Sequence, residues 1–196
     1  MSVLLKALES GRIQSTSIAW PRQVRLMAQD NKELRNRARA IFALNQNEGA
    51  NKTFKEVLSM KGDAISGARI FQASCALCHQ VRGKNGIALG PDLGTIHNWS
   101  PEAIMADILS PNLSISSGYD LWSVNLANGE NIQGIISSES PVAITFKNTG
   151  APERTIARKE IKSLKSLNMS AMPGGFESKL SKQDMADLLA FLKSNK

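Results

Sequence analysis

The chain has 196 residues, of which 42% are hydrophobic, and its 24 Lys and Arg against 17 Asp and Glu give a formal net charge of +7. This size predicts one medium domain or two small ones with a folded core, and the absence of an apolar run of about 18 residues excludes a membrane-spanning helix. Most of the excess positive charge lies in residues 1–62, where 11 Lys and Arg stand against 5 Asp and Glu. We interpret it as solvated helix faces or a docking surface for an acidic partner, and we expect no nucleic-acid binding.

Residues 3–60 are predicted to form short helices. Apolar residues recur at helical spacing in two stretches, and a proline and a capping box mark two further helix starts: Leu4, Leu5 and Leu8; Leu34, Ala38, Ile41 and Phe42; Pro21; and Thr53 with Glu56. Two interpretations of this segment stay open. It is either the end of a helical-repeat array that stacks on earlier repeats, or a plain helical extension packed on the domain that follows.

The segment Cys75-Ala76-Leu77-Cys78-His79 contains both cysteines of the chain and one of its two histidines. Cys-x-x-Cys-His is the attachment signature of c-type haem, in which two thiols bond to the haem and the adjacent imidazole ligates the iron. On a helix these three side chains share one face. The sequence therefore predicts covalently bound haem c at Cys75, Cys78 and His79.

Other uses of this motif fit the sequence less well. A thioredoxin-type site is expected near a βαβ pattern, which is absent, and a zinc site needs a second pair of Cys or His ligands. A structural disulfide leaves His79 unexplained.

The residues after the motif predict a glycine-rich loop over 83–91 and a short helix that Ser100 and Pro101 begin and Pro111 ends. Strand-like alternation then follows from about 118 to 165. Asn128-Gly129 is a hairpin signal, Val142, Ile144 and Phe146 predict a third strand before a turn at Asn148-Thr149-Gly150, and residues 155–158 predict a fourth strand of a small antiparallel sheet. A final helix is expected after a capping box at Ser181 and Asp184.

Met172 is the methionine that we expect to be the second axial ligand. It lies in Ser170-Ala171-Met172-Pro173, a loop with no helical apolar stripe just before the final helix. Most methionines fill cores, so position is what distinguishes this one among 7. Met169, on the same expected loop, is the second choice. His97 gives a third, bis-histidine arrangement, although we expect it to be a surface or packing residue.

Gly67-x-x-x-Phe71, Gly90-Pro91-Asp92-Leu93, the methionine loop and the final helix, together with the haem motif, resemble class I cytochrome c domains. The whole chain resembles the haem-binding C-terminal region of large bacterial dehydrogenase-like proteins, in which a cytochrome module follows a helical-repeat segment. The resemblance implies that the first and last helices of the module cross. It also implies that the carbonyl of Pro91 accepts the second ring N–H of His79, and it agrees with Met172 as ligand.

The fold class expected from these observations is mainly α. It consists of a helical segment over 1–61 and a cytochrome c-like haem domain over 62–196, with a small antiparallel sheet inserted at about 118–165. We expect this sheet to be a docking element for a partner or a neighbouring domain.

The expected function is electron transfer rather than enzyme catalysis, because His/Met ligation leaves the iron with no open position. The resemblance implies that electrons come from a dehydrogenase domain and leave to another redox protein. The usual bacterial route attaches haem outside the cytoplasmic membrane, so we expect a periplasmic location. The chain begins without signal-peptide features, so we expect the export signal to lie elsewhere in a longer protein.

Two alternatives remain. One is a haem enzyme or gas sensor in which the methionine loop swings away and His97, Asn98 or Trp99 supplies a polar donor. The other is a β-rich interaction module in which the haem is only structural.

Overall fold

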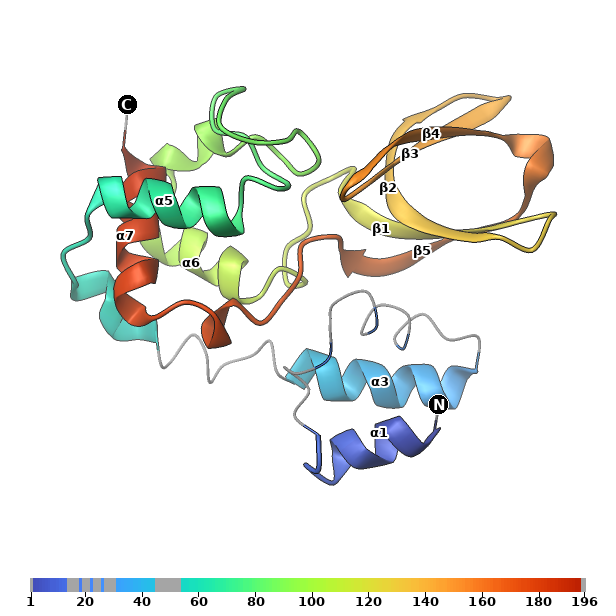
Figure 1. Cartoon of the computed structure of the whole chain (residues 1–196), viewed down its shortest axis with the longest axis horizontal. Coiled ribbons are helices and arrows are strands. Elements are labelled where there is room, and N and C mark those ends of the chain that lie inside the picture. Colours follow the sequence, from blue (N-terminus) through green and yellow to red (C-terminus); the bar gives the residue numbers. More distant parts are fainter. Residues whose placement is uncertain are drawn as a thin grey trace.

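The structure is a computed structural model that describes residues 2–13, 18, 22, 26, 31–44 and 54–194. The described residues form two N-terminal helices, a curled β-sheet, and a helical part that comprises residues 54–109 and 176–193 (Figure 1). The helices are α1 (Ser2–Glu9), α3 (Lys32–Leu44), α5 (Ala64–Ser74), α6 (Pro101–Leu109) and α7 (Lys182–Lys193). Short 3-10 helices are η2 (Lys55–Ser59), η3 (Leu93–Asn98), η4 (Arg158–Glu160) and η5 (Phe176–Ser178).

Helices α5 and α7 cross, as the resemblance implied, and Gly67 lies at the contact. A Cβ on Gly67 of α5 would lie 1.9 Å from the carbonyl oxygen of Asp187 in α7, so only a residue without a side chain allows this approach. The Asp187 carboxylate is buried at the crossing and accepts a hydrogen bond from the N–H of Asp63 at 2.8 Å. Phe71 and Leu188, both almost fully buried, belong to the apolar cluster beneath the crossing.

The predicted helix starts at Ser100 and Ser181 are confirmed. The Ser100 hydroxyl accepts from the N–H of Ala103, and α6 ends two residues before Pro111. Ser181 and Asp184 form a reciprocal capping box at the start of α7. These signals are reliable because a cap satisfies backbone N–H groups that have no partner inside the helix.

The expectation of a mainly α fold is wrong, because the chain contains a five-stranded antiparallel sheet beside its helices. The strands are β1 (Asp120–Leu126), β2 (Asn131–Glu139), β3 (Ala143–Asn148), β4 (Ala151–Ala157) and β5 (Ile161–Ser170), in the spatial order β4-β3-β2-β1-β5. The turns expected at Asn128-Gly129 and at Asn148-Thr149-Gly150 are present, between β1 and β2 and between β3 and β4.

Strand β5 is the part of the sheet that the sequence did not predict. Its apolar residues Ile161, Leu164 and Leu167 recur every third position, whereas a regular strand alternates every second. The structure explains the spacing by two register shifts against β1 and by Asn168, which has a left-handed φ of 50°. Met169, expected on a loop, therefore lies in β5.

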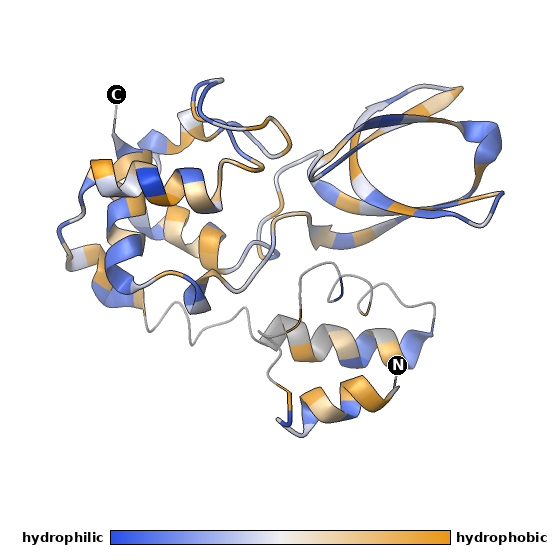
Figure 2. Cartoon of the chain, viewed as in Figure 1, coloured by the Kyte–Doolittle hydropathy of each residue, from blue (hydrophilic) through white to orange (hydrophobic). Residues whose placement is uncertain are grey.

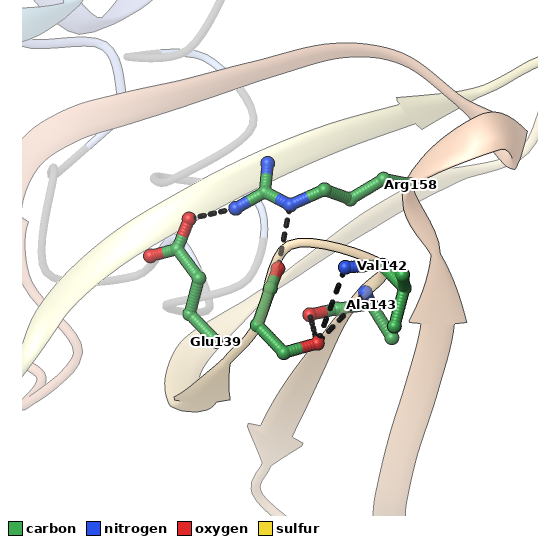
Figure 3. A network of polar contacts seen from close by, with 5 residues as sticks. Glu139, Val142, Ala143 and Arg158 are labelled. Atoms are coloured by element: carbon green, nitrogen blue, oxygen red, sulfur yellow. Dashed lines mark hydrogen bonds and ion pairs between the residues drawn. The ribbon is translucent and has the colours of Figure 1, made fainter.

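The turn between β2 and β3 is tied to the crossover that leads into β5 (Figure 3). The Ser140 hydroxyl accepts from the N–H groups of Val142 and Ala143, at 3.3 and 3.0 Å. Arg158 donates from Nε to the Ser140 carbonyl at 2.8 Å and forms an ion pair with Glu139. These contacts tie η4 to the β2–β3 turn, at the end of the sheet away from the helical part (Figure 1).

The N-terminal helices pack on the sheet. Leu5 and Leu8 of α1 and Ala38 of α3 share an apolar cluster with Leu121 of β1 and with Leu167 and Met169 of β5. In Figure 2, hydrophobic and hydrophilic segments alternate along the strands. The apolar stripe expected at Leu5 and Leu8 is confirmed, and the helical extension thus packs on the inserted sheet. Stacking on earlier repeats stays a prediction.

Some predicted features fall outside what the structure describes. The helix start at Pro21, the residue Thr53 and the side chain of Phe42 lie among these positions. The division of the chain near residue 62 also stays a prediction. Within the described part of the chain, no helix combines the length and apolar character needed to cross a bilayer.

Candidate haem-binding site

The Cys-x-x-Cys-His motif forms the turn that follows α5. Helix α5 ends at Ser74, and the N–H groups of Cys78 and His79 both donate to the carbonyl of Cys75, at 3.0 and 2.9 Å. Because the bond from His79 spans four residues, the motif keeps one helical turn although it lies beyond the helix. The two cysteines are not joined by a disulfide.

The imidazole of His79 is held from one side by the segment Gly90-Pro91. Its Nδ1 lies 2.8 Å from the carbonyl oxygen of Pro91, the contact that the resemblance implied. A Cβ on Gly90 would lie 2.6 Å from Cε1 of the ring, so this position has no space for a side chain. A hydrogen bond to Nδ1 fixes the ring orientation and leaves Nε2 as the nitrogen available to a metal.

Asp92 organises the loop that carries Pro91. Its carboxylate accepts hydrogen bonds from the N–H groups of Arg82, Gly83 and Gly94, at 2.8, 2.5 and 2.6 Å. Desolvation acts to raise the pKa of Asp92, but these three donors outweigh it and hold the pKa below its ordinary value. The Asp92 carboxylate thus holds the backbone on both sides of Pro91, the residue that contacts His79.

The pKa shifts at the motif favour neutral side chains: protonated thiols, unlike those of redox-active cysteines, and a neutral imidazole. Burial, followed by the neighbouring Cys78, raises the pKa of Cys75 to about 11. Burial also raises the pKa of Cys78, and a side-chain hydrogen bond with Thr149 offsets part of that rise. Reactive redox cysteines show the opposite shift. Burial lowers the pKa of His79, and the hydrogen bond to Pro91 offsets only part of this effect. The lowered pKa favours the neutral imidazole, the form that binds metals.

The two candidate methionines lie in different parts of the structure. Met169 is 5% exposed, in the cluster that the N-terminal helices share with the sheet. Met172 is partly buried and packs instead against the cluster of the helical part, as does Cys75. Ala171 still packs against the first cluster, so the chain crosses from one apolar cluster to the other between residues 171 and 172.

His97 is engaged within its own 3-10 helix. Its Nδ1 lies 2.8 Å from the carbonyl oxygen of Gly94, three residues earlier. Its side chain is half-buried, and η3 packs against α7. These contacts agree with a packing role for His97.

The sheet reaches the haem motif through the β3–β4 hairpin. Nζ of Lys147 donates to the carbonyl of Ala88 at 3.4 Å, and Thr149, at the tip of the hairpin, is near enough to Cys78 to affect its pKa. Sequence reasoning missed both residues. No local signal marks them, because the contacts join positions about 60 to 70 residues apart in the chain, which only the tertiary fold brings together.

The donor set fits a covalently attached haem. Two thiols and one imidazole lie in a single turn, and the imidazole has Nδ1 engaged and Nε2 available. Leu77 and Ile87 are 59% and 54% exposed, and they provide the apolar surface that a macrocycle needs. Among the described residues, no group of three or more His, Cys, Asp or Glu is arranged to hold a metal ion directly.

Comparison with known proteins identifies the family of this chain. A stretch of 56 residues is 41% identical to a cytochrome c-553-like protein of Synechocystis sp., and it covers 28% of this chain and 51% of that protein. The chain thus spans about half the length of this relative. Residues 64–196, more than half of the chain, match the cytochrome c family. The chain therefore belongs to the cytochrome c family, whose members transfer electrons through covalently bound haem c.

Proposed function

We propose that this chain relays single electrons through a haem bound to Cys75 and Cys78, with His79 and Met172 as the axial ligands of the iron. The observation that carries the proposal is the 2.8 Å contact between Nδ1 of His79 and the Pro91 carbonyl. It fixes the imidazole in one orientation with Nε2 available. The packing of Met172 and Cys75 against the same apolar cluster supports the choice of the second ligand.

The donor and acceptor are redox proteins in this proposal. The electrons come from a dehydrogenase domain of the same polypeptide or from a separate partner, and they leave to a second redox protein. We also propose that the protein works outside the cytoplasmic membrane, where covalent haem attachment occurs by the usual bacterial route. When bound, the haem supplies the one-electron chemistry, and the residues of this chain hold it and set its ligand environment.

Leucine substitutions at the two methionines test the ligand assignment. Leucine preserves most of the volume but has no sulfur, so Met172→Leu should abolish the thioether-to-iron charge-transfer band, lower the midpoint potential and open a site for carbon monoxide. Met169→Leu is the matched control. It should keep the band and cost less than about 1.5 kcal/mol of stability, because it conserves core volume.

The outcome separates the functional classes. Loss of the band in Met169→Leu alone would move the ligand to Met169, against the packing described above. Rapid carbon monoxide binding by the unmodified protein would instead favour the gas-binding alternative. An alkaline pyridine haemochrome spectrum of the same preparations reports the number of thioether links, and we expect two.

A further inference from the structure

The backbone of the methionine loop is fixed to the end of strand β5 by two consecutive hydrogen bonds. The N–H of Met172 donates to Oγ of Ser170 at 3.1 Å, and the N–H of Ser170 donates to Oδ1 of Asn112 at 2.8 Å. Ser170 is the last residue of β5 and is 8% exposed. It pairs with Asp120, the first residue of β1.

These contacts lie where the chain enters and leaves the sheet. Asn112 precedes β1, and Ser170 ends β5, so the hydrogen bond between them joins the two connections to the helical part. Met169 and Ala171 are held in the cluster beneath the N-terminal helices, while Met172 packs with the helical part. The last residue of the sheet, Ser170, therefore accepts a hydrogen bond from the backbone of Met172 directly.

We infer that Ser170 and Asn112 are positioning residues that keep the Met172 thioether on the iron. The inference rests on the proposed ligation by Met172. Releasing the sulfur requires the loop to move, and the hydrogen bonds from Met172 to Ser170 and from Ser170 to Asn112 oppose that movement. Removing one leaves a partly buried donor without its partner and raises the population of the form with an open iron position. An added ligand binds in proportion to that population.

The strand offers a matched control for Ser170. Oγ of Ser166 accepts from the N–H of Asn168 at 3.1 Å, an equivalent backbone contact across two residues, four positions earlier in β5, and it also donates to Oδ1 of Asn168 at 3.3 Å. Ser166→Ala removes a hydroxyl of the same kind from the same strand. It leaves the contacts of Met172 and Asn112 in place, so it reports the cost of losing such a hydrogen bond in β5 generally.

The test measures carbon monoxide binding to the reduced haem protein, together with the charge-transfer band and the midpoint potential. Ser170→Ala and Asn112→Ala should each increase the rate of carbon monoxide binding about tenfold, the effect of losing roughly one buried hydrogen bond. Ser170→Thr keeps the hydroxyl and should behave like the unmodified protein. Ser166→Ala should change the rate by less than about twofold. A residue that only stabilises the fold would lower the melting temperature without opening the iron site well below that temperature.

The results separate failure of this inference from failure of the proposed function. If Met172→Leu abolishes the band but Ser170→Ala and Asn112→Ala bind carbon monoxide as slowly as the unmodified protein, Met172 remains the ligand and the positioning role is overturned. Equal acceleration by Ser166→Ala overturns it as well. If Met172→Leu keeps the band, the assignment of Met172 as a ligand fails, and the positioning role of Ser170 and Asn112 fails with it. Should Ser170→Ala yield no folded haem protein, Asn112→Ala decides the question, because Asn112 lies outside the strand.

Discussion

Gly90 shows how one missing side chain shapes the haem site. The position that its Cβ would take is 2.6 Å from Cε1 and 2.9 Å from Nδ1 of His79, so the backbone itself forms the wall against which the imidazole lies. The N–H of Gly90 donates to the carbonyl of Cys78 at 2.6 Å and ties this wall to the motif. The Pro91 carbonyl can reach Nδ1 only because the loop approaches so closely.

Gly90→Ala should displace the imidazole of His79 and weaken its contact with Pro91. Overpacking of this kind costs about 1–3 kcal/mol, which denaturant unfolding of the haem protein measures. The midpoint potential should change as well, because the hydrogen bond to Nδ1 tunes the basicity of the ligand. Ala88→Ser, at an exposed position in the same loop, is the control. An unchanged potential and stability in Gly90→Ala would show that the ring is not held against this wall.

At the scale of elements, the crossing of α5 and α7 supports the motif. Helix α5 leads into Cys75, and Phe71 on this helix lies 5.3 Å, centroid to centroid, from Phe191 of α7. Gly62 and Gly67 both approach the backbone of α7, within 2.1 and 1.9 Å of carbonyl oxygens if a Cβ is added. The direction of α5, and so the place of the haem turn, depends on these two contacts.

Gly67→Ala should separate the two helices. A Cβ cannot be accommodated by a side-chain rotation, because the atom it meets is a backbone oxygen. We expect a loss of at least about 3 kcal/mol in the free energy of unfolding and a lower yield of protein with attached haem. Gln72→Ala, on the exposed face of the same helix, should stay within about 0.5 kcal/mol of the unmodified protein. Equal stability of the two variants would contradict the close crossing.

At the scale of the whole molecule, the described residues form three apolar clusters, and two of them adjoin the methionine loop. One cluster lies under the α5–α7 crossing, and another joins the N-terminal helices to β1 and β5. The sheet has a further cluster of its own around Val124, Ile144 and Phe146. Ala171 packs against the cluster of the N-terminal helices and the sheet, and Met172 packs against the cluster of the helical part. The chain therefore passes from the sheet to the haem-binding part at the proposed ligand.

Leu5→Ala and Leu188→Ala test whether these clusters open separately. Both leucines are fully buried, and each substitution should cost about 2–5 kcal/mol. In native-state hydrogen exchange, Leu5→Ala should lower the protection of amides in β1 and β5 more than in α5 and α7, and Leu188→Ala should do the reverse. Equal loss of protection in all four elements would mean that the chain opens as one cooperative unit.

The sequence by itself determined the features whose signals are local. Cys75, Cys78 and His79 form a motif within five residues, the caps at Ser100 and Ser181 satisfy backbone groups three positions away, and the β-hairpin turns depend on residues that accept unusual φ values. Such features depend on chemistry between near neighbours, so their residue pattern is sufficient to identify them.

Only the tertiary structure decided how those features are assembled. Strand β5 was not predicted because bulges and the left-handed Asn168 break its alternation. For the same reason Met169 was expected on a loop rather than in a strand. Met169 and Met172 are three residues apart and chemically identical, yet packing puts them in different clusters. The hydrogen bond from Ser170 to Asn112 spans 58 residues. Contacts of this kind exist because a chain buries its apolar surface over long sequence separations, and no local pattern encodes which distant residues will meet.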